Sequence, residues 1–183
     1  RRPRAVEGGA VKWLVFLVSI VVATGIEAQE RILSFNSQIQ IGARGELTVL
    51  ETIVAQVEGQ QIKRGILRDF PTDYQDRYGR KVTVPFEVLS VRRDGQAENY
   101  SLSRQKNGVS VRIGNANVML PRGRHVYEIA YQTNFQVGFF EQHDELYWNV
   151  NGNGWTFAMD EISAAAPLPR PVPPAELNVE AHT

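Results

Sequence analysis

The stretch ILSFNSQIQIGARGELTVLETIVAQV, residues 32–57, decides the fold of this chain. The apolar residues of one parity in its first half are Leu33, Phe35, Ile39 and Ile41. Those of one parity in its second half are Leu47, Val49, Ile53, Ala55 and Val57. Because side chains alternate between the two faces of a β-strand, this spacing predicts two half-buried strands. With Gly42 and Gly45 between them, the strands are expected to form an antiparallel hairpin with one apolar face.

The two-residue period continues through the rest of the chain. Asp94-Gly95 and Asn107-Gly108 suit tight hairpin turns, so residues 82–113 are predicted to form a three-stranded meander. Residues 125–137 alternate again and predict one further long strand. We therefore expect an all-β domain, an antiparallel β-sandwich of about eight or more strands, preceded by one N-terminal hydrophobic helix.

The N-terminal part has the features of an export signal. Residues 13–26 are largely apolar and follow a flank that contains four basic residues, Arg1, Arg2, Arg4 and Lys12. This layout, ending in a small residue at Ala28, is typical of a secretory signal peptide. A spanning helix needs about 17–25 apolar residues, so an uncleaved anchor is the alternative.

The sequence thus predicts three parts. Residues 1–28 are the signal peptide or N-terminal membrane anchor, residues 29–166 the extracytoplasmic β-sandwich domain, and residues 167–183 a Pro-rich exit segment. We expect the polypeptide to continue beyond residue 183.

The composition limits the classes of partner. The chain contains no cysteine, so its stability must come from packing rather than from disulfides. Without residues 1–28 it carries 16 basic and 18 acidic residues, and its longest basic clusters are Arg92-Arg93 and residues 122–124. Nucleic-acid binding relies on a concentrated positive footprint, so we expect no nucleic-acid partner.

Four segments resemble one known family. In sequence order they are GELTVLE (45–51), GILRDFP (65–71), HVYEIAY (125–131) and DELYWNVNGNGW (144–155). Together they are similar to the predicted membrane proteins that carry "domain of unknown function 2207". The resemblance implies an extracytoplasmic β-rich domain after a signal peptide, followed in full-length members by transmembrane helices. It implies no established activity.

Glu51 has the parity of the apolar residues around it, so its carboxylate is expected to point into the core. A buried charge without a partner costs several kcal/mol, and a guanidinium can bond both carboxylate oxygens. Arg68 in GILRDFP is the predicted partner, with Arg64 as second candidate. We expect a structural ion pair between Glu51 and Arg68. The alternatives are an exposed Glu51 at a bulge or edge, and a catalytic acid or base.

Asn151-Gly152 is the strongest short-range turn signal in the chain and predicts a hairpin over residues 146–159. With these two residues at the turn, Trp148 would stand opposite Trp155 as an aromatic cross-strand pair. The expected alternation would bury this pair beneath a solvated hairpin rim.

Carboxylates beside aromatic rings also occur in glycan sites, so Asp144, Glu145 and Asn149 are candidate ligand-site residues. Residues 149–160 also match a calcium-loop template in part, but Asp160 is the only carboxylate at a ligand position. The sequence shows no histidine or cysteine spacing of a zinc site and no nucleophile motif. We therefore expect no catalytic residue, no metal and no cofactor.

These patterns favour a non-catalytic binding or structural module of the cell envelope. Its expected location is membrane-associated and extracytoplasmic. The expected partners are the membrane, through the N-terminal segment and helices beyond residue 183, and an envelope protein or a glycan. The alternative is a carbohydrate-binding or glycan-processing domain that uses the Trp148/Trp155 hairpin and the neighbouring carboxylates.

Overall fold

The opening hairpin forms as the side-chain alternation predicts. In the computed structural model, which describes residues 29–75 and 78–180, β1 (Arg31–Ile41) pairs antiparallel with β2 (Leu47–Val57). The expected N-terminal helix and cleavage position fall in residues 1–28, outside the described residues. Within the described part, no helix is long and apolar enough to cross a bilayer.

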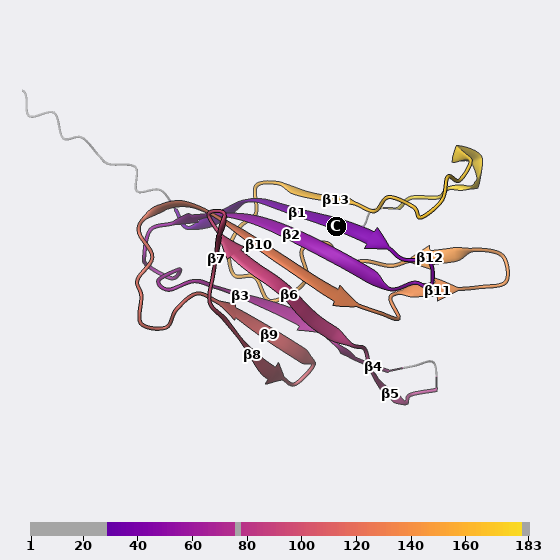
Figure 1. Cartoon of the computed structure of the whole chain (residues 1–183), viewed down its shortest axis with the longest axis horizontal. Helices are drawn as coiled ribbons and strands as arrows, with labels where there is room; N and C mark the ends of the chain where they lie inside the picture. Colours follow the sequence, from indigo (N-terminus) through magenta and orange to yellow (C-terminus); the bar gives the residue numbers. More distant parts are fainter. Residues whose placement is uncertain (1–28, 76–77, 181–183) are drawn as a thin grey trace, which may run out of the picture.

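Two sheets form the body of the molecule (Figure 1). The larger contains, in spatial order, β13 (Ile162–Ala165), β1, β2, β10 (Gly123–Thr133), β6 (Phe86–Arg93) and β7 (Gln96–Ala97). The smaller contains β3 (Ile66–Pro71), β9 (Gly108–Ile113) and β8 (Tyr100–Gln105). Every pair in these sheets is antiparallel except β1 with β13, which is parallel.

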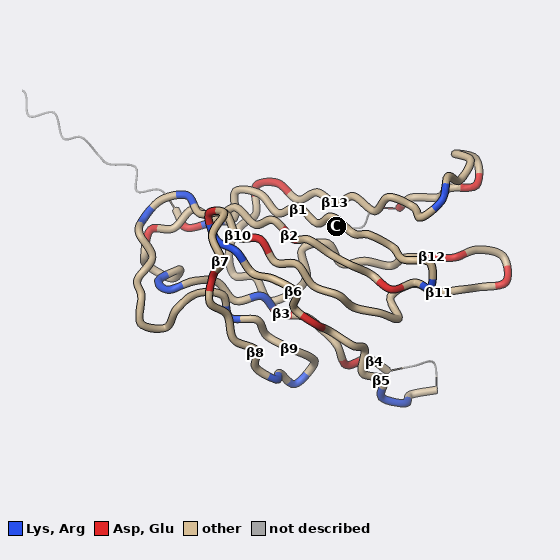
Figure 2. Tube along the Cα trace, viewed as in Figure 1, with Lys and Arg blue, Asp and Glu red and all other residues tan. Residues whose placement is uncertain are grey.

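Two short hairpins extend at one end of the sandwich (Figure 1). One pairs β4 (Asp73–Gln75) with β5 (Lys81–Thr83), and the other pairs β11 (Val137–Phe139) with β12 (Asp144–Leu146). A single 3-10 turn, η1 (Pro174–Glu176), lies in the C-terminal segment. Lys, Arg, Asp and Glu are spread over the molecule, mostly near strand ends and in loops, as Figure 2 shows.

The core lies between the two sheets. The larger sheet contributes the buried side chains of Phe35, Ile53 and Ile129, and the smaller sheet contributes Ile66 and Val111. All of these side chains belong to one apolar cluster, so the sheets pack face to face. The predicted all-β sandwich is therefore confirmed, with thirteen strands in the described part of the chain.

The first strand departs from strict alternation. A β-bulge between Ile32 and Ser34 makes Leu33 an extra residue, so Ile32 is fully buried and Leu33 only partly. Ile32 also donates its N–H to the carbonyl of Ala158, far along the chain. The prediction that Leu33 faces the core is wrong, because a bulge reverses the face on which the preceding side chains lie.

The predicted three-stranded meander over residues 82–113 is also wrong. β6 and β7 belong to the larger sheet, whereas β8 and β9 join β3 in the smaller one. The turn at Asp94 and Gly95 does form, with φ of 51° and 78°. The chain then crosses between layers, and Val111 and Ile113 cover the core from the opposite side. Turn residues specify a hairpin, but burial decides which sheet each strand joins.

The strand predicted over residues 125–137 ends early. β10 stops at Thr133, and Val137 belongs to β11 in a separate hairpin. Between them, Phe135 has a φ of 60° and is 71% exposed, and its N–H donates to the side chain of Asn134. A left-handed residue turns the chain away from the sheet, and the alternation of residue types does not reveal it.

Candidate functional site

A buried ion pair joins the two sheets. Glu51 on β2 is 0% exposed and Arg68 on β3 is 3% exposed. Arg68 donates Nε–H to Glu51 Oε2 at 2.8 Å and Nη2–H to Glu51 Oε1 at 2.7 Å. The structure thus places the two side chains in the two-point geometry that a guanidinium and a carboxylate favour.

Three neighbours complete the ion pair. The Tyr131 hydroxyl donates to Glu51 Oε1 at 2.9 Å, and Arg68 Nη1 donates to the Asp69 carbonyl at 2.8 Å. The Arg68 guanidinium also lies 4.5 Å from the centre of the Phe70 ring. These contacts satisfy both oxygens of the carboxylate and every nitrogen of the guanidinium, which offsets their loss of hydration.

The protonation equilibria follow from this packing. Burial alone would lower the pKa of Arg68, but the charge and hydrogen bonds of Glu51 raise it above its ordinary value. Burial, followed by the negative charge of Glu51, raises the pKa of Tyr131 well above its ordinary value. Tyr131 is therefore a neutral hydrogen-bond donor, and Arg68 is charged at any physiological pH.

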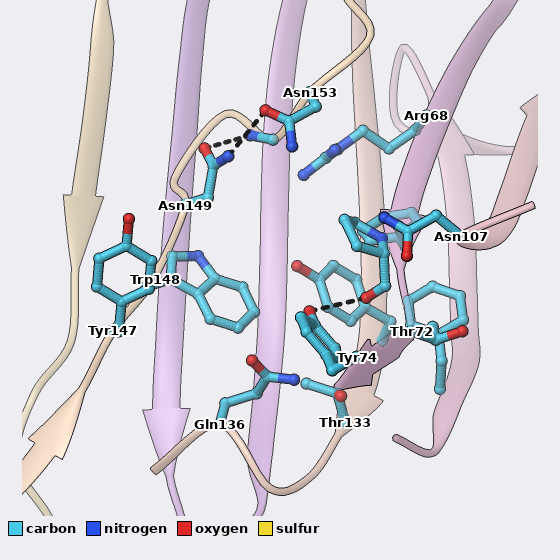
Figure 3. A pocket seen from close by; sticks show the side chains of 15 residues that line it. Arg68, Thr72, Tyr74, Asn107, Thr133, Gln136, Tyr147, Trp148, Asn149 and Asn153 are labelled. Atoms are coloured by element: carbon cyan, nitrogen blue, oxygen red, sulfur yellow. Dashed lines mark hydrogen bonds between the residues drawn. The ribbon is translucent and has the colours of Figure 1, made fainter. Parts of the chain in front are cut away.

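A cavity of about 320 Å³ opens beside the ion pair (Figure 3). We call it the inner cavity. Its aromatic lining comes from Phe70, Tyr74, Phe86, Tyr131, Tyr147 and Trp148. Its amide lining comes from Asn107, Gln136, Asn149 and Asn153. Arg68 forms part of the wall, and Figure 3 shows the Trp148 ring opposite Tyr74 across the space.

Two polar groups in the wall of the inner cavity have no partner. The Thr72 hydroxyl belongs to a side chain that is 2% exposed, and the Trp148 indole nitrogen is itself inaccessible to solvent. Neither forms a hydrogen bond with any residue that the structure describes. Buried polar groups are normally paired, so these two are exceptions, and the packing around each atom shields it from the cavity.

A second hollow of about 280 Å³ adjoins the first. The two share Phe70, Pro71, Asn107 and Asn153 in their walls, so they lie side by side, and we call them together the groove. Lys106 and Asp69 line its outer end. Within the described residues, the Asp69 carboxylate has no ion-pair partner.

Residues 31–183 match the family described as "Predicted membrane protein (DUF2207) N-terminal domain". The chain belongs to this family. The resemblance inferred from four sequence segments is therefore confirmed, and with it the description of a predicted membrane protein.

One curated relative and two solved structures are similar to the chain. The "Uncharacterized protein YciQ" of Escherichia coli (strain K12) is 31% identical over 148 residues, which cover 78% of this chain and 23% of YciQ. Native yeast LTA4 hydrolase has a TM-score of 0.43 at 13% identity, over 58% of this chain and 15% of that one. The M1 zinc metallopeptidase from Deinococcus radiodurans has a TM-score of 0.40 at 11% identity, over 57% and 20%. The chain spans about a quarter of YciQ, and the two structural likenesses carry no argument about activity.

The predicted hairpin over residues 146–159 does not form. Outside β12, residues 147–158 make no ladder, and the Trp148–Trp155 cross-strand pair is absent from the described structure. The Trp155 ring meets Phe35 edge-on instead, at 6.2 Å, and its indole N–H donates to the Asn151 carbonyl at 2.8 Å.

The reason is that both arms of this segment pack inward. Trp148 and Val150 before the turn, and Trp155, Phe157 and Met159 after it, all lie against the core. Packing on the core removes the apolar side chains of both arms from water, which favours this arrangement. Alternate side chains of each arm still point in one direction, but they pack against the core of the sandwich rather than against a neighbouring strand.

The candidate ligand residues are divided by the fold. Asn149 lines the inner cavity, where its amide donates to Asn153 Oδ1 at 3.1 Å and accepts the Gly152 N–H at 3.0 Å. Asp144 and Glu145 lie exposed on β12 and are absent from the walls of the groove. The structure therefore brings Trp148 and Asn149 to one site and leaves both carboxylates outside it.

Sequence reasoning missed Glu30. Its carboxylate accepts N–H bonds from Glu58, Gln60, Gln61 and Ile62, at 2.6 to 3.3 Å. Burial alone would raise the pKa of Glu30, but these four backbone donors lower it below its ordinary value. Glu30 thereby ties the start of β1 to the loop after β2. No sequence motif predicts this role of Glu30, because the donors are backbone groups about 30 residues away.

Proposed function

We propose that this chain is the extracytoplasmic ligand-binding domain of a membrane protein of the cell envelope, and that it acts without catalysis. The observation that carries the proposal is the inner cavity, whose wall combines six aromatic rings with four amide side chains. Concave sites with aromatic walls and a few polar groups are typical of ligand-binding sites.

The proposed location is supported by two observations. The family is that of a predicted membrane protein, and the described domain follows a basic flank and an apolar run.

The chemistry of the groove favours binding over catalysis. Its inner wall consists of aromatic rings, neutral amides and hydroxyls, with one cation, Arg68. Glu51 lies behind that wall with both oxygens engaged, and the burial-raised pKa of Tyr131 keeps its hydroxyl protonated. We assign Glu51 and Arg68 the role of a structural ion pair that holds β3 against β2.

Glycan binding is the second candidate function. Tyr147 is exposed beside the half-buried Trp148, and aromatic faces next to amide side chains suit sugar rings. However, the two carboxylates that the sequence offered for such a site, Asp144 and Glu145, lie outside the groove, and its one carboxylate, Asp69, lines only the outer hollow.

A topology reporter tests the location. Alkaline phosphatase fused after residue 183 folds only outside the cytoplasm, so the fusion should be active in cells that express the whole chain. The matched control lacks residues 1–28 and should be inactive. Equal activity of the two fusions would contradict an exported domain.

Indole NMR spectra test binding at the groove. The full chain, labelled with 15N-tryptophan in detergent micelles, has three indole signals, and Trp148→Phe assigns the one in the cavity. The probes are N-acetylproline dimethylamide, which has acceptors only, and methyl N-acetylglucosaminide, which has donors and acceptors. At least one should shift the Trp148 signal and spare that of Trp155, whose N–H is already bonded. If neither shifts it at millimolar concentration, the binding function is wrong.

A further inference from the structure

We infer that β8 is an interaction edge, and that it pairs antiparallel with β8 of a second copy of this chain about a two-fold axis at Leu102. This inference concerns the open edge of the smaller sheet and does not depend on the proposed binding function. It is carried by the exposure of β8, by the direction of its backbone groups and by the symmetry of its sequence.

β8 is the free edge of the smaller sheet (Figure 1). It pairs with β9 on one side, over six consecutive residues without a register shift, and all six of its residues are exposed. Tyr100 and Leu102 belong to the inner face, since they lie opposite the buried Ile113 and Val111, yet they are 43% and 53% exposed. The smaller sheet therefore extends beyond the cover of the larger one.

The other edges of the two sheets in the described structure are short or protected. β7 has two residues and β13 four, and residues 152–154 lie against Arg68 and Asp69 of β3. The part of β6 that β7 leaves unpaired follows Pro85 and contains a bulge at Leu89. Short strands, covering segments, proline and bulges all hinder pairing at an edge. β8 has none of these protections, so it is the edge best suited to pairing.

The backbone groups of alternate β8 residues point toward the open side. The Gly114 N–H donates to the Asn99 carbonyl at 2.8 Å, one step before β8 in the same register. In an antiparallel ladder, residues of one parity bond to one neighbouring strand, and residues of the other parity point to the opposite side. Residues of the parity of Asn99 therefore bond to β9, and the outward N–H and C=O groups are those of Tyr100, Leu102 and Arg104.

The sequence of β8 is nearly symmetric about Leu102. In an antiparallel pair centred there, Leu102 lies opposite the partner's Leu102, Ser101 opposite the partner's Ser103, and Tyr100 opposite the partner's Arg104. Each outward N–H group then meets an outward carbonyl. Opposite residues of a ladder project on the same face, so this centre also keeps the cores of the two domains on one side of the joined sheet.

The facing side chains are complementary. Two leucines meet at the axis, serines pair across the strands, and the Arg104 guanidinium meets the ring of the partner's Tyr100. Arg104 Nη2 donates to both oxygens of Asp73, at 2.9 and 2.7 Å, yet 58% of the Arg104 side chain is exposed. Arg104 is the only charged residue of β8, so no like charges lie opposite each other. This complementarity favours a second copy over an unrelated strand, which would share only the backbone bonds.

Cysteine cross-linking tests the register, because the chain contains no cysteine of its own. Two differently tagged whole chains are expressed in the same cells, one with Ser101→Cys and one with Ser103→Cys, and the membranes are oxidised mildly. These chains should form a disulfide, since the Cα atoms of such a non-hydrogen-bonded pair lie about 4.5 Å apart. Ser101→Cys in both copies should cross-link far less, because the two residues are then diagonal neighbours at about 7–8 Å.

The matched control is Ala164→Cys in both copies, at an exposed position of the edge strand β13, and it should not cross-link. Equal yields for the three combinations would overturn the inference. A disulfide between Ser101→Cys and a different protein, in place of the dimer, would refute the second copy as the occupant.

A charge exchange at Leu102 tests the two-fold centre, using the same Ser101→Cys and Ser103→Cys pair. Leu102→Lys in both copies places like charges opposite each other and should weaken dimerisation about fivefold or more. Leu102→Lys in one copy with Leu102→Glu in the other should restore the cross-link. Urea denaturation should show that each variant keeps its fold, since Leu102 is half exposed. If the two like charges leave the cross-link unchanged, or the opposite charges fail to restore it, the inferred centre is wrong.

Discussion

The ion pair of Glu51 with Arg68 and the wall of the inner cavity beside it show two ways to bury polar groups. At the ion pair, each charged group reaches a partner within 2.9 Å. In the neighbouring cavity wall, Thr72, directly after β3, and Trp148, two residues after β12, have buried polar atoms without partners. The contrast teaches that the fold pairs its buried charges, whose isolation costs most, and leaves some buried neutral groups unpaired, whose isolation costs less.

The largest effect is expected from breaking the ion pair of Glu51 with Arg68. Arg68→Met leaves the Glu51 carboxylate buried and unpaired, so it should lower the free energy of unfolding by about 3–5 kcal/mol, measured by urea denaturation. Combining it with Glu51→Leu removes the stranded charge and should recover at least half of the loss. A single change that costs under about 1 kcal/mol would show that the pair does not hold the sheets together.

Glu30, directly before β1, is a second buried charged group whose hydrogen bonds are satisfied within the domain. Glu30→Ala strands four backbone N–H groups and should cost about 2–3 kcal/mol. Its pKa is lower in the folded state, so its stabilisation is present above the unfolded pKa of about 4.3 and is lost as pH falls through the folded value. The variant should therefore lose less stability than the wild type between about pH 5 and pH 3. If the free energy of unfolding falls by the same amount in both proteins over this pH range, Glu30 does not have this role.

Two tyrosines on β10 allow a comparison between a paired and an unpaired buried hydroxyl, with a smaller expected effect on stability. Tyr131→Phe removes a donor from Glu51 and should cost about 1.5 kcal/mol. Tyr127→Phe removes a buried hydroxyl that has no partner in the described structure, and it should be neutral or slightly stabilising. Thermal unfolding of both variants under one condition distinguishes them, and an equal loss would show that hydroxyl pairing does not determine the cost.

The smallest expected effect concerns the cavity wall itself. Thr72→Val replaces an unpaired hydroxyl with a methyl group and should raise the free energy of unfolding by up to about 1 kcal/mol. The matched control is Thr133→Val in the same wall, which loses the bond to the Pro85 carbonyl and should destabilise by about 1 kcal/mol. Denaturant midpoints measure both. If Thr72→Val destabilises as much as Thr133→Val, the Thr72 hydroxyl has a partner in solution.

Much of the fold could be predicted from the residues. The alternation in residues 32–57 predicts the central hairpin, and the apolar neighbours of Glu51 predict its burial and its need for a cation. The site could be predicted only in part. Trp148 and Asn149 do lie at the groove, but Thr72 carried no signal, since its importance comes from a missing partner rather than from a motif.

Sequence reasoning was wrong where the choice between partners is not local. Asn151-Gly152 has the composition of a hairpin turn, yet its two arms pack on the core instead of on each other. Asp94-Gly95 does form its turn, yet the chain then changes sheets. A dipeptide restricts its own φ and ψ angles, and it contains no information about which distant surface offers more burial.

By itself, the sequence determined the all-β class, the hairpin of β1 with β2, and a buried carboxylate that requires a cation. Side-chain alternation and the cost of burying charge act over neighbouring residues, so a linear pattern records them. Only the tertiary structure decided which strands share a sheet, that Glu30 binds four backbone donors, and that Thr72 and Trp148 come together in the wall of one cavity. These features depend on contacts between residues far apart in the chain, and the packing of the whole sandwich determines which of those contacts form.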